Sequence, residues 1–202
     1  TMIVSTSYFG AHGFGAGSFL LRSDDGGETW SSLSPPDGLG GAVAFAPTHP
    51  SLLYGLGCGR LFASQDTGAT WYPLGEGLPC SSQVLVLDPR EPRLLYVGTD
   101  GAGLYRSTDG GATFRPFGHG LESAIVTSLI VDPTSSANIY AGVTGQGVWR
   151  WNAGSGQWTP LNAGFPVGDF SGALALDPQH PAALYVGTMG HGVFRLLLPY
   201  RP

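Results

Sequence analysis

The hydrophobic residues of this chain fall into short runs that are separated by glycine, proline and aspartate. One stretch shows the pattern with four short apolar runs in succession: Val84–Leu87, Leu94–Thr99, Leu104–Ser107 and Phe114–Phe117. Short runs rich in β-branched and aromatic side chains, bounded by turn residues, are typical of strands. No window repeats apolar residues at the i, i+3, i+4 and i+7 spacing of an amphipathic helix. The pattern therefore predicts an all-β fold.

The strand pattern repeats along the chain. A tyrosine in an equivalent strand recurs at intervals of 42, 44 and 45 residues, at Tyr54, Tyr96, Tyr140 and Tyr185. A period near 43 residues with four short strands is typical of a β-propeller blade. We recognise 18 strands in five units, which span approximately residues 1–40, 41–80, 81–124, 125–170 and 171–202.

The five units predict a single β-propeller domain of four-stranded antiparallel blades over residues 1–202. The first and last units show three strands each, so we expect a closed five-bladed ring with two trimmed blades. The alternative is an excerpt of a larger propeller. A lone open arc is not expected, because it would expose strand edges.

An eight-residue motif, S-x-D-x-G-x-T-[WF], follows the third strand of three units. It occurs at Ser23–Trp30, Ser64–Trp71 and Ser107–Phe114. This motif resembles the Asp-box repeat of bacterial sialidases, sortilin-type receptors, xyloglucanase-type glycosidases and photosystem assembly factors. The resemblance implies a propeller and leaves the function open.

Each Asp-box has a structural interpretation. The aspartate accepts hydrogen bonds from backbone N–H groups of its own turn, the glycine permits positive φ, and the aromatic residue is expected to be buried. In the fourth unit Ala153 replaces the aspartate, and Asn152 beside it is a partial substitute. The structural motif residues are Ser23, Asp25, Gly27, Trp30, Ser64, Asp66, Gly68, Trp71, Ser107, Asp109, Gly111 and Phe114.

Antiparallel strands sort the loops onto two sides of a propeller. The Asp-boxes and the turns between first and second strands share one side, which we call the Asp-box side. The turns between second and third strands and the connectors between blades share the other, which we call the loop side. In the sialidases that the motif resembles, the active site lies on the loop side.

The largest departure from the repeat is an insertion of about nine residues on the loop side of the first unit. Its aromatic and histidine side chains suit a sugar ring or an apolar partner. The alternative is that these side chains fold inward and plug the channel mouth or the closure seam. The candidate ligand- or partner-binding residues are Tyr8, Phe9, His12 and Phe14 of the insertion, together with Phe170 and His191.

Catalysis has weaker support in the sequence. Loop-side carboxylates could serve a glycoside hydrolase, but no spacing sets the separation of a catalytic pair. A standard sialidase is excluded, because its Arg-Ile-Pro signature is missing and four of the nine arginines recur at one strand position: Arg22, Arg106, Arg150 and Arg195. We assign no catalytic residue. A carbohydrate-active protein, either a glycoside hydrolase or a lectin-like sugar binder, stays as the alternative to a non-catalytic binding or assembly module.

Composition limits the partners. The formal net charge of −5 argues against a nucleic-acid surface. No apolar run is long enough to cross a membrane, and the histidines show no metal-ligand spacing. We therefore expect a protein partner or a glycan, without a metal or a cofactor.

The two cysteines, Cys58 and Cys80, both map to the loop side. A disulfide between them would close a loop of about 22 residues. Such a bond implies an oxidising, extracytoplasmic setting, whether secreted, periplasmic or envelope-associated. The alternative is two buried thiols.

Overall fold

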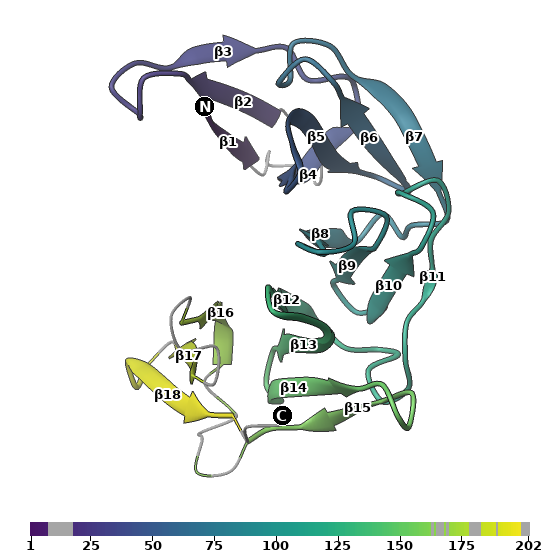
Figure 1. The fold of residues 1–202 in the computed structure, drawn as a ribbon, viewed down its shortest axis with the longest axis vertical. Helices are drawn as coiled ribbons and strands as arrows, with labels where there is room; N and C mark the ends of the chain where they lie inside the picture. Colours follow the sequence, from purple (N-terminus) through teal and green to yellow (C-terminus); the bar gives the residue numbers. More distant parts are fainter. Residues whose placement is uncertain are drawn as a thin grey trace, which may run out of the picture.

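Five antiparallel sheets follow one another along the chain in the computed structural model, which describes residues 1–7, 18–162, 164, 168, 170–177, 183–188 and 190–198. They form an arc in which β1 lies near one end and β18 near the other (Figure 1). The predicted all-β propeller architecture is confirmed. No helix in the described ranges is long and apolar enough to cross a membrane.

Sheets 2 to 4 have four strands each, and sheets 1 and 5 have three. The strands of the first two sheets are β1 (Met2–Ser7), β2 (Ser18–Ser23), β3 (Ser31–Leu33), β4 (Leu39–Ala46), β5 (His49–Gly57), β6 (Arg60–Ser64) and β7 (Tyr72–Glu76). Those of the third and fourth are β8 (Ser82–Leu87), β9 (Leu95–Thr99), β10 (Leu104–Ser107), β11 (Arg115–Pro116), β12 (Val126–Asp132), β13 (Ser135–Val143), β14 (Gly147–Asn152) and β15 (Gln157–Pro160). The fifth has β16 (Phe170–Leu176), β17 (Ala183–Thr188) and β18 (Val193–Leu197).

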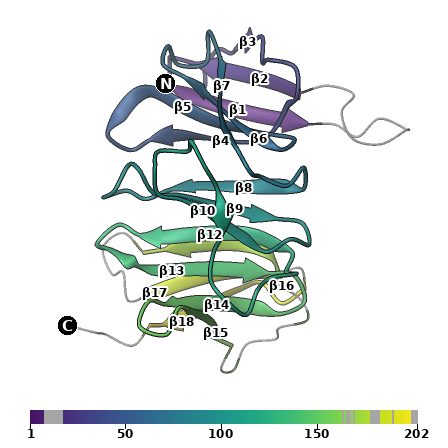
Figure 2. The ribbon, with the colours of Figure 1, turned by 90° about the vertical axis from the view of Figure 1, so that its right-hand side faces the viewer.

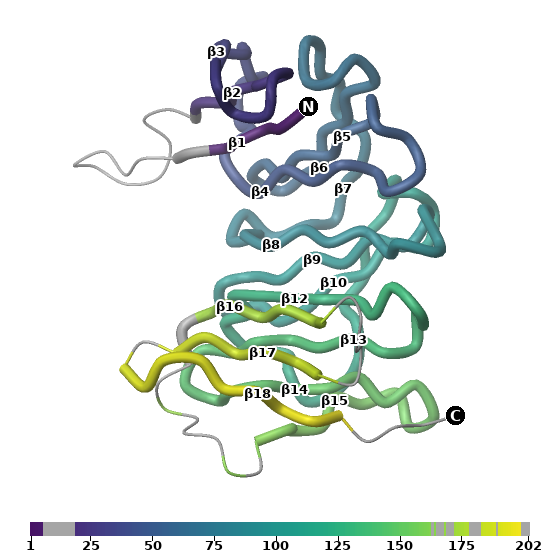
Figure 3. The backbone as a smooth tube through the Cα atoms, turned by 60° about the vertical axis from the view of Figure 1, so that its left-hand side comes forward, coloured from purple at the N-terminus to yellow at the C-terminus, as the bar shows by residue number. Residues whose placement is uncertain are grey.

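The arc is open. The first strands of consecutive sheets contact one another on its concave side, and the last strands of the four-stranded sheets lie at the outer rim (Figure 1). Figures 2 and 3 show the first sheet at the top and the last sheet overlapping the fourth sheet, away from the first. The expectation of a closed five-bladed ring is therefore wrong for the described residues, and the excerpt of a larger propeller fits.

The hydrophobic core lies between consecutive sheets. Four clusters of buried side chains fill the four spaces between neighbouring sheets. Alternate residues of a strand point to opposite faces, so one strand serves two clusters. In β9, Leu95 and Val97 pack toward the second sheet, whereas Tyr96 packs toward the fourth. Because both faces of an inner sheet are buried, its strands are apolar on both faces.

The recurring arginines are part of this repeat. In three sheets an arginine of the third strand lies directly opposite a tyrosine of the second strand. The pairs are Tyr96–Arg106, Tyr140–Arg150 and Tyr185–Arg195. Arg106 also lies over the Phe117 ring, with its guanidinium carbon 4.5 Å from the ring centroid. These arginines therefore have a structural position that repeats from blade to blade.

The burial predicted for the Asp-box aromatics holds in part. Phe114 is buried and Trp71 is partly buried, because each packs against the preceding sheet. The prediction is wrong for Trp30, which is 40% exposed. Trp30 belongs to the sheet at the end of the arc, where no other described sheet covers it.

Candidate functional site

On the loop side, turns and inter-blade connectors are joined to one another by backbone contacts. The Cys58 N–H in the β5–β6 turn donates to the Gly38 carbonyl in the β3–β4 connector, at 3.3 Å. A disulfide joins Cys58 to Cys80 in the β7–β8 connector, as predicted. The next residue of that connector, Ser81, accepts a 2.8 Å bond from the Asp100 N–H in the β9–β10 turn.

The same arrangement continues across the third and fourth sheets. The N–H groups of Gly101 and Gly103 both donate to the Ala124 carbonyl in the β11–β12 connector, each at 3.2 Å. The neighbouring carbonyl of Ile125 accepts a 3.0 Å bond from the Thr144 N–H in the β13–β14 turn. We call this series from Gly38 to Thr144 the loop-side belt. Backbone hydrogen bonds and one disulfide hold the belt together without a bound partner.

Acidic side chains dominate the charge that these loops carry. Asp37, Asp100 and Glu122 are exposed on three different loops, and Arg60 is an exposed cation at the start of β6. Backbone N–H groups, its own and that of Gly120, donate to the Glu122 carboxylate and hold its pKa below the usual value. These loops therefore present an acidic surface on a fixed backbone.

The structure describes only two of the six candidate binding residues, Phe170 and His191. Tyr8, Phe9, His12 and Phe14 lie outside the described residues. Phe170 is the first residue of β16, and only its backbone is described. His191 is exposed in the β17–β18 turn, where its N–H donates to Thr188 Oγ1 at 3.0 Å. Whether the six residues form one site stays a prediction.

The Asp-box turns have one geometry in all three blades. In the third blade the Ser107 hydroxyl donates to Asp109 at 2.7 Å and accepts a 2.8 Å bond from the Gly111 N–H. Asp109 also accepts bonds from the Thr113 N–H and hydroxyl, at 3.0 and 2.6 Å. The carboxylate therefore closes its own turn, as the interpretation of these aspartates as turn residues expects.

The hydrogen bonds lower the pKa of these carboxyls. The Thr70 hydroxyl and N–H, with Ser64, lower the pKa of Asp66 from its ordinary value of 3.8 to about 2. The corresponding threonine and serine donors lower the pKa of Asp25 and Asp109 in the same direction. A carboxyl with a depressed pKa is a poor general acid at neutral pH.

The fourth blade keeps the turn without its aspartate. Asn152 Oδ1 accepts bonds from the N–H groups of Gly154 and Ser155, at 3.1 and 3.3 Å. The substitution of Asn152 for the missing carboxylate is therefore confirmed. Trp158 takes the aromatic position and is buried against Phe117 of the preceding blade.

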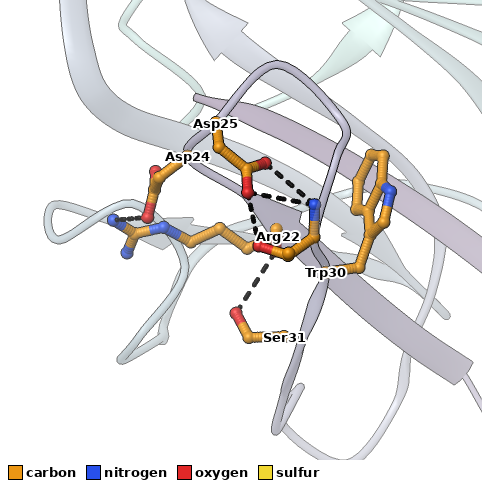
Figure 4. Close-up of a pocket in the computed structure, with 6 residues that line it drawn as sticks. Arg22, Asp24, Asp25, Trp30 and Ser31 are labelled. Carbon is orange, nitrogen blue, oxygen red and sulfur yellow. Dashed lines mark hydrogen bonds and ion pairs between the residues drawn. The ribbon is translucent and has the colours of Figure 1, made fainter.

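An open depression of about 290 Å³ lies against the first Asp-box (Figure 4). Its charged groups are engaged within the chain. Arg22 pairs with Asp24 at 2.7 Å, and Asp25 accepts bonds from Ser23 and Thr29. Trp30 lines the same depression with its exposed indole. The paired charges leave this depression without a carboxylate that is free to act on a substrate.

The sequence did not predict a contact at the outer rim between the loop side of one blade and the Asp-box of the next blade. Glu76 pairs with Thr113 in the Asp-box of the next blade, and His119 pairs with Gln157 in the same way. Because sheets twist, the end of an outer strand lies beside the next blade. The glycines at this contact, such as Gly75 beside Gly111, were the available signal.

The carboxyls with a shifted pKa give no support for a glycosidase acid. Every described carboxyl whose pKa departs from its ordinary value departs downward, whereas the acid of such an enzyme needs a raised pKa. Across the described ranges, no three histidine, cysteine or carboxylate side chains gather as a metal site.

The comparisons agree with this geometry. Residues 21–32 match the family model of the BNR/Asp-box repeat. The fold is an Asp-box repeat β-propeller. A comparison of the sequence with curated proteins gives no match.

Solved propeller structures are similar over most of this chain. The GH74 xyloglucanase from Xanthomonas campestris has a TM-score of 0.75 at 19% identity, over 96% of this chain and 35% of that one. YCF48 bound to D1 peptide has a TM-score of 0.63 at 18% identity, over 88% and 58%. The extracellular domain of a two component system protein from B. thetaiotaomicron has a TM-score of 0.59 at 15% identity, over 82% and 24%.

This Asp-box propeller therefore spans about a third of the xyloglucanase chain and somewhat over half of the YCF48 chain. At these identities the likeness shows the fold alone. Enzymes and peptide-binding proteins share that fold, so the fold does not decide between chemistry and binding.

Proposed function

We propose that this Asp-box propeller is a non-catalytic binding or assembly module that takes a protein partner on its loop side. The observation that carries the proposal is the loop-side belt, in which turns and connectors are fixed by backbone hydrogen bonds and one disulfide. A surface that is already ordered loses less conformational entropy when it binds.

The charge of these loops supports a basic partner. Asp37, Asp100 and Glu122 are exposed there, with Arg60 as an opposing charge. Acidic side chains spread over several fixed loops complement lysine or arginine side chains of a partner segment. We further propose that Tyr8, Phe9 and Phe14 of the insertion serve as aromatic anchors for the partner.

The disulfide also supports a location. A bond between Cys58 and Cys80 persists in oxidising compartments and is rare in the cytosol. We therefore propose an extracytoplasmic setting for the protein and its partner.

A peptide-binding experiment tests the proposal. Fluorescence anisotropy would measure the binding of a labelled octalysine peptide and of an octaglutamate peptide as the control. We expect binding of the basic peptide alone, weakened by salt and by the double substitution Asp100→Asn and Glu122→Gln. Equal affinity for both peptides, or no effect of the double substitution, would contradict the proposed surface.

The alternative class, a carbohydrate-active protein, needs its own assay. Xyloglucan oligosaccharides would be incubated with the protein and the release of new reducing ends measured. We expect no release above the buffer control. Turnover that is lost in Asp100→Asn or Glu122→Gln would make the protein a glycoside hydrolase and overturn the non-catalytic function.

A further inference from the structure

One position of the third strand always faces the next blade. In blades 1 to 4 this position is Leu20, Leu61, Leu104 and Val148, and none of these side chains is more than 3% exposed. Each belongs to the cluster shared with the following sheet. The equivalent residue of blade 5 is Val193, which is 72% exposed.

The Asp-box aromatic has the opposite relation and always faces the preceding blade. Phe114 packs with Leu61 of blade 2, and Trp158 packs with Phe117 of blade 3. These two side chains are 6% and 3% exposed, whereas Trp30 of blade 1 is 40% exposed. Burial of this aromatic therefore requires a blade on the preceding side.

Each end of the arc exposes further apolar side chains around these positions. Beside Trp30 the first sheet exposes Met2 and Val4, and Met2 lies against the same Asp-box glycine, Gly27, as the indole. Leu197 shares the face of Val193 in β18 and is 73% exposed. We call these two surfaces the Trp30 face and the Val193 face.

The space around the Asp-box glycines is a second, independent observation that a blade is missing at the Trp30 face. A Cβ added to Gly68 would lie 2.9 Å from Leu33 of blade 1, and one added to Gly111 would lie 2.6 Å from Leu61 of blade 2. At Gly27, the equivalent residue of blade 1, such a Cβ would meet no residue of another blade among the described residues. The first blade keeps the glycine that elsewhere admits a leucine from a preceding blade.

We propose that each face is one half of a blade–blade interface and is covered by a further Asp-box blade of the same polypeptide. The Trp30 face takes a third-strand leucine, as Trp71 and Phe114 meet Leu20 and Leu61. The Val193 face takes an Asp-box aromatic, as Val148 meets the next sheet. All four interfaces of the arc join consecutive segments of one polypeptide, which favours the same polypeptide over a second copy.

The experiment uses the natural polypeptide that contains these residues. Hydroxyl-radical footprinting read by mass spectrometry would compare the oxidation rates of Trp30, Trp71 and Trp158 in one folded sample. We expect Trp30 to be oxidised as slowly as the buried Trp158. Oxidation of Trp30 as fast as in the urea-unfolded polypeptide would overturn the proposal.

Dilution distinguishes a covering blade of the same polypeptide from one that a second copy supplies. If the protection of Trp30 is unchanged on dilution and light scattering gives a monomer, the covering blade lies in the same polypeptide, as expected. Protection that is lost together with a dimer on dilution would assign the face to a second copy and overturn the proposal.

A substitution tests the Val193 face in the same polypeptide. Val193→Asp is expected to lower the melting temperature by about 5–10 °C, comparably to Val148→Asp, because both would place a carboxylate between blades. Val193→Leu is the matched control and should leave the melting temperature unchanged. An unchanged melting temperature in Val193→Asp would mean that the face is open to solvent and would contradict the inference.

Discussion

Ser107 shows what each Asp-box residue contributes. Its hydroxyl is buried, accepts the Gly111 N–H and donates to Asp109. In Ser107→Ala the Gly111 N–H would be left buried without an acceptor. We expect the free energy of unfolding to fall by about 1–3 kcal/mol, measured by urea unfolding.

The control for that substitution is Thr108→Ala. Thr108 is the exposed neighbour in the same turn. Its loss should change the free energy of unfolding by less than about 0.5 kcal/mol. Equal losses in the two variants would show that the serine hydroxyl has no special part in the turn.

The Asp-box carboxyls predict an acid-dependent loss of stability. The pKa of Asp66 is about 2 in the folded protein and 3.8 ordinarily, because Thr70 and Ser64 donate to the carboxylate. A depressed folded pKa contributes stability above pH 3.8, and this contribution is lost as the pH falls toward 2.

Urea unfolding between pH 5 and pH 2 measures this effect. The free energy of unfolding should fall over this window, and it should fall less steeply in Asp66→Asn, which cannot titrate there. A slope that is the same in both proteins would show that the hydrogen bonds of Asp66 do not stabilise the folded state.

At the scale of the element, Gly75 determines how close two blades come. A Cβ at this position in β7 would lie 1.8 Å from the Gly111 carbonyl oxygen in the next Asp-box. Since the obstacle is backbone, Gly75→Ala should force the blades apart and cost about 1–3 kcal/mol. Urea unfolding of Gly75→Ala and of the control Gly190→Ala, whose Cβ would meet nothing within 4 Å, tests this. Equal stability of the two variants would contradict the contact.

Much of the element scale could be predicted from the sequence. The 43-residue period and the Asp-boxes predicted the strands, their order and the turn chemistry, because these depend on residues that are close in sequence. The belt from Gly38 to Thr144 was not predictable, because its bonds join loops of different blades through backbone atoms that carry no sequence signal. Only the disulfide at its centre was predicted, from the loop positions of Cys58 and Cys80.

At the scale of the whole molecule, the repeat period alone did not predict whether the blades form an arc or a ring. It sets the number of blades but does not set the angle between them, so the open arc could not be distinguished from a closed ring (Figure 1). The exposure of Trp30 has the same origin. Burial of an Asp-box aromatic depends on the neighbouring sheet, whereas the motif specifies only its own turn.

The central claim is that the loop side binds a partner while the Asp-boxes only stabilise the blades. The most direct test is the affinity of three proteins for the same octalysine peptide: the wild type, Ser107→Ala, and a variant with residues 7–17 shortened to a four-residue turn. We predict that Ser107→Ala keeps its affinity despite lower stability. The shortened variant should lose at least about tenfold in affinity, equivalent to 1.4 kcal/mol, at an unchanged melting temperature. Full affinity in the shortened variant, with a lower melting temperature, would show that the insertion is structural and contradict the claim.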